Sequence, residues 1–166
     1  RAPLAPIVPT LKGVSLLVDC GANVDAKPSN LLQFAQMGSI YMENAMKIER
    51  PTVGILNIGA EEEKGNALVK EAYPLLKECK GINFIGSVEA RDFIYGAADV
   101  VVTEAFAGNV MLKTIEGVAS GLFKLIKNSI TATPVSTIGA ALVKPQLKNV
   151  AKIFDATEYG GAPLLG

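Results

Sequence analysis

Short apolar runs alternate with longer amphipathic stretches over residues 14–102. The runs are rich in Val, Leu and Ile, and their length is typical of buried strands in a parallel sheet. They are residues 14–19, 53–58, 82–85 and 100–102. Helices are expected from Pro28 toward Pro51 and over residues 66–80, with a short helical turn over residues 89–95. The alternation predicts an α/β fold, a three-layer sandwich with a mainly parallel sheet.

Three polar loops follow these strands, and each precedes a segment with helical spacing. They are residues 19–28, 59–66 and 103–110. The first and last are centred on Asn23 and Asn109, and the middle one contains Lys64. Strand ends in an open α/β sheet face one side, where ligands bind against helix N-termini. The sequence therefore predicts that the loops line one cleft.

The chain changes character after Asn109. Apolar residues recur at helical spacing over residues 110–130, and residues 131–143 contain no charge. Lys144, Lys148 and Lys152 then follow at intervals of four, which predicts one basic helix face. We expect residues 110–154 to form a helical hairpin that projects from a single α/β domain. Residues 110–130 are long enough to span a bilayer, but their lysines oppose this.

Side chains of the expected hairpin favour membrane association without spanning. Apolar residues at helical spacing, an uncharged middle and flanking lysines favour burial at an anionic membrane surface. The residues expected to take part are Leu122, Ile126, Ile138, Leu142, Lys144 and Lys148. Two alternatives remain open, because the apolar faces also suit a homodimer interface and the lysines suit an acidic protein partner.

Composition excludes several classes of function. The chain has 166 residues, enough for one domain, and zero formal net charge, which argues against nucleic-acid binding. It has no histidine, so neither a Ser-His-Asp nor a Cys-His mechanism can be built from these residues. No dinucleotide or P-loop glycine pattern is present. With these patterns absent we expect no cofactor. Cys20 and Cys79 lack metal-ligand spacing and form no disulfide framework, so we expect no metal and a reduced, cytoplasmic protein.

Four stretches of the chain are similar to one known family. The most specific is LLVDCGANVDAKPSNLLQFAQMGSIY, residues 16–41, and residues 53–77, 82–92 and 98–117 match as well. The chain resembles the bacterial phosphate acyltransferases of phospholipid synthesis, the acyl-carrier-protein:phosphate transacylases of the PlsX family. It departs from them at Glu104-Ala105-Phe106, where Asp-Gly-Phe is expected. The resemblance implies an isocitrate-dehydrogenase-like or phosphotransacetylase-like fold, a homodimer, and a fragment that lacks the N-terminal and C-terminal parts.

The resemblance implies that a long fatty acyl group passes from acyl carrier protein to inorganic phosphate, giving acyl-phosphate. The available residues are compatible with this reaction. Phosphate, with a pKa near ~6–7 by analogy with its esters, is already anionic and needs no strong base. The thiol leaving group has a pKa near ~8.5 by analogy with cysteine, so it needs little acid help. The protein has to supply position and charge stabilisation, for which N–H groups, a lysine and amides suffice.

The resemblance implies that Lys64 and Asn109 are the catalytic residues. Lys64 lies at a strand-to-helix turn, where its ammonium would hold phosphate or an oxyanion. Its alternative role is that of a solvated loop lysine beside three glutamates. Asn109 would cap the long helix, present its amide to an oxyanion, or do both.

Substrate binding is expected from the same loops. The candidates are Asn23, Asp25, Lys27, Gly65, Asn66 and Gly108. Asp25 has the alternative role of capping a turn. Asp19 either orients Lys27 or satisfies backbone groups, and Cys20 is expected to serve packing.

Two other functions fit the sequence. A short-chain phosphotransacetylase would keep the fold and use coenzyme A thioesters, and comparing acetyl-CoA with long-chain acyl carrier protein separates the two. A non-catalytic membrane-binding or partner-binding module would show no thioester cleavage. The resemblance favours a cytoplasmic, peripherally membrane-associated protein, with the downstream membrane glycerol-3-phosphate acyltransferase as a further partner.

Overall fold

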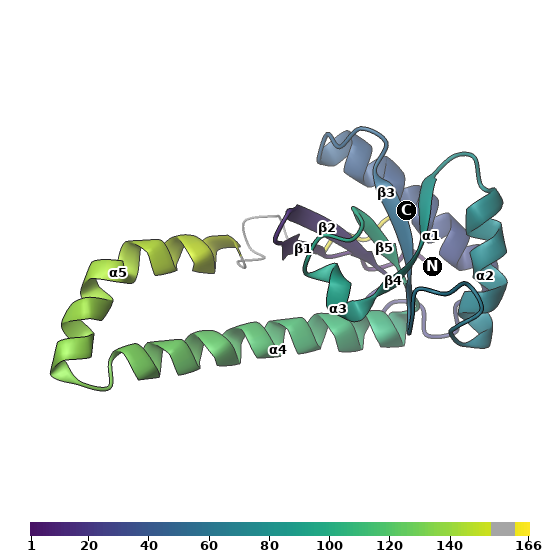
Figure 1. Cartoon of the computed structure of the whole chain (residues 1–166). Helices are drawn as coiled ribbons and strands as arrows, with labels where there is room; N and C mark the ends of the chain where they lie inside the picture. The colour runs from purple at the N-terminus through teal and green to yellow at the C-terminus, as the bar shows by residue number, and fades with distance from the viewer. Residues whose placement is uncertain (154–161) are drawn as a thin grey trace.

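A five-stranded sheet forms the centre of the part of the chain that the structure describes, residues 1–153 and 162–166 (Figure 1). In this computed structural model the strand order is β1-β2-β5-β3-β4. β1 pairs antiparallel with β2, and the other neighbours are parallel, so the expected mainly parallel sheet is confirmed. The strands are β1 (Ile7–Thr10), β2 (Gly13–Val18), β3 (Thr52–Asn57), β4 (Asn83–Glu89) and β5 (Val100–Val102).

Helices cover both faces of the sheet and give the predicted three layers. α1 (Pro28–Ala45) and α2 (Ala67–Glu78) pack on one face, and α3 (Ala90–Phe93) and the start of α4 (Ala105–Ile130) pack on the other. Alternate residues of a strand point to opposite faces. Leu16 and Val18 therefore belong to the core under α1 and α2, whereas Leu17 belongs to the opposite core. A Cβ atom at Gly38 would lie 2.7 Å from Val100 Cγ1, so the absence of a side chain there allows α1 to approach the sheet closely.

Boundaries of the α/β part differ from the expectation in three places. β1 is a strand, although its segment is punctuated by prolines; it lies at the end of the strand order, where proline is tolerated. β4 continues to Glu89 rather than ending at residue 85. α1 ends at Ala45, before Pro51, and the following turn contains two residues with positive φ, Lys47 and Arg50.

The end of the chain returns to the segment that precedes β1. Ala5 N–H donates to the Pro163 carbonyl at 2.9 Å, and Leu165 N–H donates to the Pro3 carbonyl at 3.1 Å. Leu165 is buried and joins the core under α1 and α2. The chain is therefore anchored to the domain both before and after the projecting helices.

α4 and α5 (Pro134–Ile153) form a helical hairpin, which projects from the sheet (Figure 1). α5 begins ten residues before Lys144, the first lysine of the expected basic face, because Thr133 and Ser136 cap it reciprocally and Pro134 occupies its first position. The uncharged stretch is thus mostly helical. The last residue of the expected hairpin, Phe154, and the side chain of Lys152 lie outside the described residues. No helix in the described part is long and apolar enough to cross a membrane.

Candidate active site

Loops that follow β2, β3 and β5 lie at the same edge of the sheet, because these strands run parallel. β5 lies between β2 and β3, so the loop at its end is flanked by the other two. Thr103 N–H donates to the Val18 carbonyl, and Asp19 N–H donates to the Thr103 carbonyl at 3.3 Å. The three loops therefore lie at one edge of the sheet.

Asp19 organises the loop after β2 from a fully buried position. Its carboxylate accepts hydrogen bonds from the N–H groups of Leu4 (2.9 Å), Ala22 (3.0 Å) and Asn23 (2.7 Å). It also accepts one from Asn23 Nδ2 at 2.8 Å, which fixes the amide of that candidate residue. These bonds confirm one of the two roles expected of Asp19, which is to satisfy backbone groups. The Val18–Asp19 peptide bond is cis.

The other candidates of this loop are at its far end, where α1 begins. Asp25 is exposed, and Lys27 precedes the first residue of the helix. Lys27 N–H donates to Asn30 Oδ1 at 2.9 Å, which closes the first turn. The backbone of Lys27 is therefore committed to the helix start, and its side chain is the part left for a ligand.

Lys64 is exposed and paired in the loop after β3. Its ammonium lies 2.8 Å from Glu61 Oε2, and this hydrogen bond raises the pKa of Lys64 and lowers that of Glu61. Glu62 pairs with Lys77 at 2.8 Å. Two of the three glutamates that oppose an anion near Lys64 thus have cationic partners. A ligand anion at Lys64 has to compete with Glu61.

Asn57 holds the Lys64 loop against the sheet. It is only 7% exposed at the end of β3. Its Nδ2 donates to the Lys64 carbonyl at 3.1 Å and to Ser87 Oγ at 3.0 Å, and its Oδ1 accepts from Ile58 N–H at 2.8 Å. Gly65 has a φ of 106°, and a Cβ there would lie 2.6 Å from Asn57 Oδ1. Only glycine fits comfortably at this position of the loop.

Glu104, and not Asn109, caps α4. Its carboxylate accepts from Phe106 N–H at 2.7 Å and from Ala107 N–H at 2.8 Å, so an anion already occupies the first turn. The helix begins at Ala105, which makes Asn109 its fifth residue and rules out the expected capping role. Asn66 does cap α2, since its Oδ1 accepts from Val69 N–H at 2.9 Å.

A cleft of about 270 Å³ opens among the ends of β3 and β5 and the starts of α2 and α4. The predicted residues Gly65 and Asn66 line it. Ala107 faces this cleft, and Asn109, two residues further on, lies about 200° around the helix axis. Polar residues that line the cleft and that the sequence did not single out are Asn57, Thr103 and Glu104.

Asn109 borders a second hollow of about 340 Å³, between the β1 segment and α4. Cys20 also lines it, and burial, followed by the charges of Asp19 and Glu116, raises the pKa of the Cys20 thiol to about 12. The thiol therefore stays protonated and serves packing. Lys64 adjoins the cleft through Gly65, so the structure separates the two residues that were expected to share one cleft. Their catalytic roles stay predictions.

Comparison with known proteins identifies the group to which this architecture belongs. Residues 1–166 match the family described as "Fatty acid synthesis protein". The chain belongs to this family. It is 58% identical over 167 residues to the phosphate acyltransferase of Desulfitobacterium hafniense, covering 100% of this chain and 50% of that protein. It is 52% identical over 166 residues to the phosphate acyltransferase of Clostridium acetobutylicum, with the same two coverages.

The fold is also that of a solved structure. The EutD phosphotransacetylase from Staphylococcus aureus superposes with a TM-score of 0.54 at 17% sequence identity, over 72% of this chain and 43% of that one. At this identity the likeness concerns the fold, and it confirms the expected phosphotransacetylase-like architecture. The chain spans about half the length of the curated relatives that it matches.

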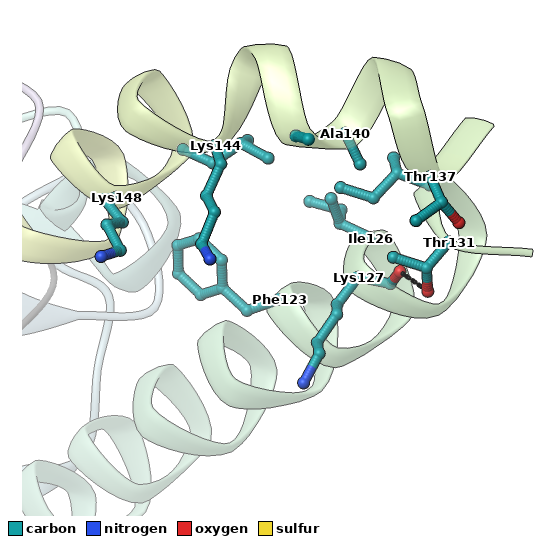
Figure 2. A pocket seen from close by; sticks show the side chains of 11 residues that line it. Phe123, Ile126, Lys127, Thr131, Thr137, Ala140, Lys144 and Lys148 are labelled. Atoms are coloured by element: carbon teal, nitrogen blue, oxygen red, sulfur yellow. Dashed lines mark hydrogen bonds between the residues drawn. The ribbon is translucent and has the colours of Figure 1, made fainter. Parts of the chain in front are cut away.

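In this member of the fatty acid synthesis protein family, the residues expected to meet a membrane form two groups. Leu122, Ile138 and Leu142 are exposed, at 55%, 68% and 76%. Ile126, Lys144 and Lys148 instead line a groove between α4 and α5 (Figure 2). Lys144 and Lys148 are exposed as well, so the two groups differ in whether they line the groove and not in exposure alone.

Sequence reasoning missed Asn57 and Glu104. Asn57 ends a strand immediately before the Lys64 loop, and a polar residue at the buried end of an apolar strand was a usable signal. Glu104 was noted only as a departure from the family pattern, and glutamate is not among the residues that usually cap a helix N-terminus, so the sequence carried no signal for this cap.

Proposed function

We propose that this chain contributes to a phosphate acyltransferase, which moves a long acyl group from acyl carrier protein to inorganic phosphate. The observation that carries the proposal is the identity of 58% and 52%, over the whole chain, to proteins named phosphate acyltransferase. The site supports it, because its cleft combines amide groups and helix starts with apolar walls that suit an acyl chain.

The reaction needs little acid–base help from the protein. A phosphate oxygen attacks the thioester carbonyl, and the tetrahedral oxyanion collapses with cleavage of the carbon–sulfur bond. The sulfur leaves as a thiolate and takes its proton from solvent. Since phosphate is already anionic and the thiolate is a fair leaving group, catalysis depends on position and on stabilising the oxyanion.

In this proposal Lys64 and Asn109 act on the reacting groups. Lys64 exchanges Glu61 for phosphate, because its ammonium is exposed and its loop is held rigidly by Asn57. Asn109 offers its amide from the other side of α4, which requires a substrate that reaches around the helix start. Substrate positioning falls to the remaining candidates, Asn23, Asp25, Lys27, Gly65, Asn66 and Gly108.

The test compares substrates and variants in the protein extended to the length of its curated relatives. Acyl-phosphate formation from hexadecanoyl acyl carrier protein should exceed that from acetyl-CoA. Lys64→Ala and Asn109→Ala should each lower the rate by ~10²-fold or more, the usual loss when one preorganised donor is removed. Lys64→Arg should rescue only partly, because its planar fork differs from a point charge. Wild-type rates in both alanine variants would remove these residues from the site, and preference for acetyl-CoA would favour the short-chain alternative.

We further propose that the outer faces of the hairpin attach the protein to anionic membrane surfaces and to a second copy of itself. Val135, Ile138 and Leu142 expose 81%, 68% and 76% of their surface on α5, and lysines flank them in the sequence. On α4, Val118 and Leu125 are also exposed, at 64% and 68%. A peripheral position would bring acyl-phosphate to the membrane glycerol-3-phosphate acyltransferase. Sedimentation showing only monomer at micromolar concentration would refute the homodimer.

A further inference from the structure

Asn57 lies at the end of β3, directly before the loop that carries Lys64, and protein contacts use both hydrogens of its side-chain amide. These two hydrogens go to the Lys64 carbonyl at 3.1 Å and to Ser87 Oγ at 3.0 Å. Asn57 Oδ1 accepts from Ile58 N–H at 2.8 Å. Although Asn57 borders the cleft, it therefore has no side-chain N–H left to donate to a substrate.

The main chain of Lys64 is fixed on both sides. Its N–H donates to the Glu61 carbonyl at 3.2 Å, and its carbonyl accepts from Asn57. The next residue, Gly65, has a φ of 106°, and a Cβ there would lie 2.6 Å from Asn57 Oδ1. The chain then enters α2 at its cap, Asn66. The freedom left to Lys64 lies in its side chain, and Asn57 helps to determine where that side chain begins.

The contact between Asn57 and Ser87 ties this loop to the sheet. Ser87 belongs to β4, which pairs in parallel with β3, and it is in register with Ile55. The hydrogen bond therefore joins two paired strands through residues that are 30 positions apart in the sequence. Sites held by strands are more precise than sites held by loops alone. The Lys64 carbonyl is thus anchored to a rigid part of the domain.

The Lys64 ammonium lies back over its own loop. It is 2.8 Å from Glu61 Oε2, and a Cβ at Gly59 would lie 3.1 Å from Lys64 Nζ. Both members of the ion pair are exposed, and such pairs contribute little in water, so another anion can replace Glu61. Because the main chain is fixed, the position of that anion depends on the backbone that Asn57 holds.

We propose that Asn57 is a positioning residue for phosphate binding, which acts by holding the backbone of Lys64 at the edge of the cleft. The inference rests on the proposed phosphate acyltransferase function, in which Lys64 binds phosphate. Asn57 itself contacts neither substrate, and Ser87 orients its amide. A displacement of about 1 Å can cost on the order of 10²-fold in rate, so loss of this contact should have a measurable effect on phosphate.

The test measures phosphate at Lys64 without turnover, in the protein extended to the length of its curated relatives. Lys64 is labelled with acetic anhydride, and mass spectrometry follows its protection by inorganic phosphate. Asn57→Ala should raise the phosphate concentration at half protection by about tenfold or more. KM for phosphate should rise in parallel, whereas KM for hexadecanoyl acyl carrier protein should stay within about twofold of wild type, because Asn57 does not contact the acyl carrier.

Thr52→Val is the matched control, at the opposite end of the same strand. Thr52 Oγ1 donates to Asp99 Oδ2 at 2.6 Å and accepts from Asp99 N–H at 2.9 Å. This substitution therefore also removes two hydrogen bonds between distant segments, about 17 Å from Asn57 along β3. It should lower the urea midpoint and leave the protection of Lys64 by phosphate unchanged.

Three outcomes would overturn the proposal. Equal half protection in wild type and Asn57→Ala would leave Asn57 a structural role only, with the proposed function intact. An equal shift in Thr52→Val would reduce the effect to lost stability. Absence of protection in wild type would end the role of Lys64, and acyl-phosphate formation would then decide the proposed function separately.

Ser87→Ala decides if Asn57→Ala does not fold. It keeps the Asn57 side chain and removes only the contact that anchors the amide to β4. The phosphate concentration at half protection of Lys64 should still rise, by about threefold or more, as expected for the loss of one hydrogen bond. No rise in a folded Ser87→Ala variant would overturn the proposal.

Discussion

Gly108→Ala is expected to destabilise the protein, although it replaces glycine inside a helix. A Cβ at Gly108 would fall well inside contact distance of the Asp19 carbonyl oxygen and 2.8 Å from Thr103 Cγ2. The carbonyl belongs to the backbone and cannot rotate away. The substitution therefore has to move the start of α4 off the loop that carries Asp19.

The expected size follows from two opposing effects. Helix propensity favours alanine over glycine by roughly 0.5–1 kcal/mol. Overpacking a well-filled site costs about 1–3 kcal/mol, and contact with rigid backbone points to the upper end. The net loss is about 2 kcal/mol, which lowers the Tm of a chain of this size by roughly 4–8 °C. In the same helix, a Cβ at Gly117 would meet nothing within 4 Å, so Gly117→Ala should raise the Tm by about 1–4 °C.

Thermal unfolding of both variants, followed by circular dichroism, measures the contrast. Opposite signs are the decisive result, because propensity alone predicts stabilisation at both positions. Acyl-phosphate formation below the melting range should fall in Gly108→Ala and persist in Gly117→Ala. If Gly108→Ala is as stable as wild type, the close contact between α4 and the Asp19 loop is wrong.

Three further outcomes are expected. Asn57→Asp removes the two hydrogen bonds that the amide donates, so the free energy of unfolding should fall by about 2–3 kcal/mol; an unchanged urea midpoint would contradict this. The raised pKa of Cys20 leaves very little thiolate at pH 8, so iodoacetamide should modify the partly exposed Cys79 first, with Cys20 reacting faster as pH rises toward 12; equal rates in the native protein would refute it. Ile138→Glu with Leu142→Glu should abolish sedimentation with anionic vesicles while sparing soluble turnover, because both side chains are exposed; retained vesicle binding would exclude insertion by this face.

Local pattern was sufficient to predict most of the sheet domain. A run such as residues 100–102 is flanked on both sides in the sheet, and a strand of this kind is apolar throughout, which makes it visible in the sequence. β1 escaped prediction because its proline content argues against a strand unless the strand lies at an edge. Position at an edge is a property of the whole sheet, and the local pattern does not contain it.

The face of α4 that meets the cleft depends on where the helix starts, and the sequence placed that start wrongly. The expected cap was Asn109. The Glu104 cap moves the start by several residues and turns Ala107 to the cleft instead. The Lys64 and Asn66 turn was placed correctly, since Asn66 itself is the cap and the strand before it ends at a buried residue. Polar contacts between distant segments, such as Asn57 with Ser87, have no signature at the level of sequence spacing.

Backbone hydrogen bonds join Ala5 to Pro163 and Leu165 to Pro3. The hairpin is therefore an insertion, and the sheet domain holds the chain both before and after such an excursion. The hairpin is mostly helical and makes its own backbone hydrogen bonds, so shortening or lengthening both helices together leaves its anchored ends in place. The reach of the hairpin can therefore vary among relatives, or be altered by removing matched heptads from α4 and α5, with little effect on the domain that carries the cleft. Reach and chemistry are, in this architecture, separately adjustable properties.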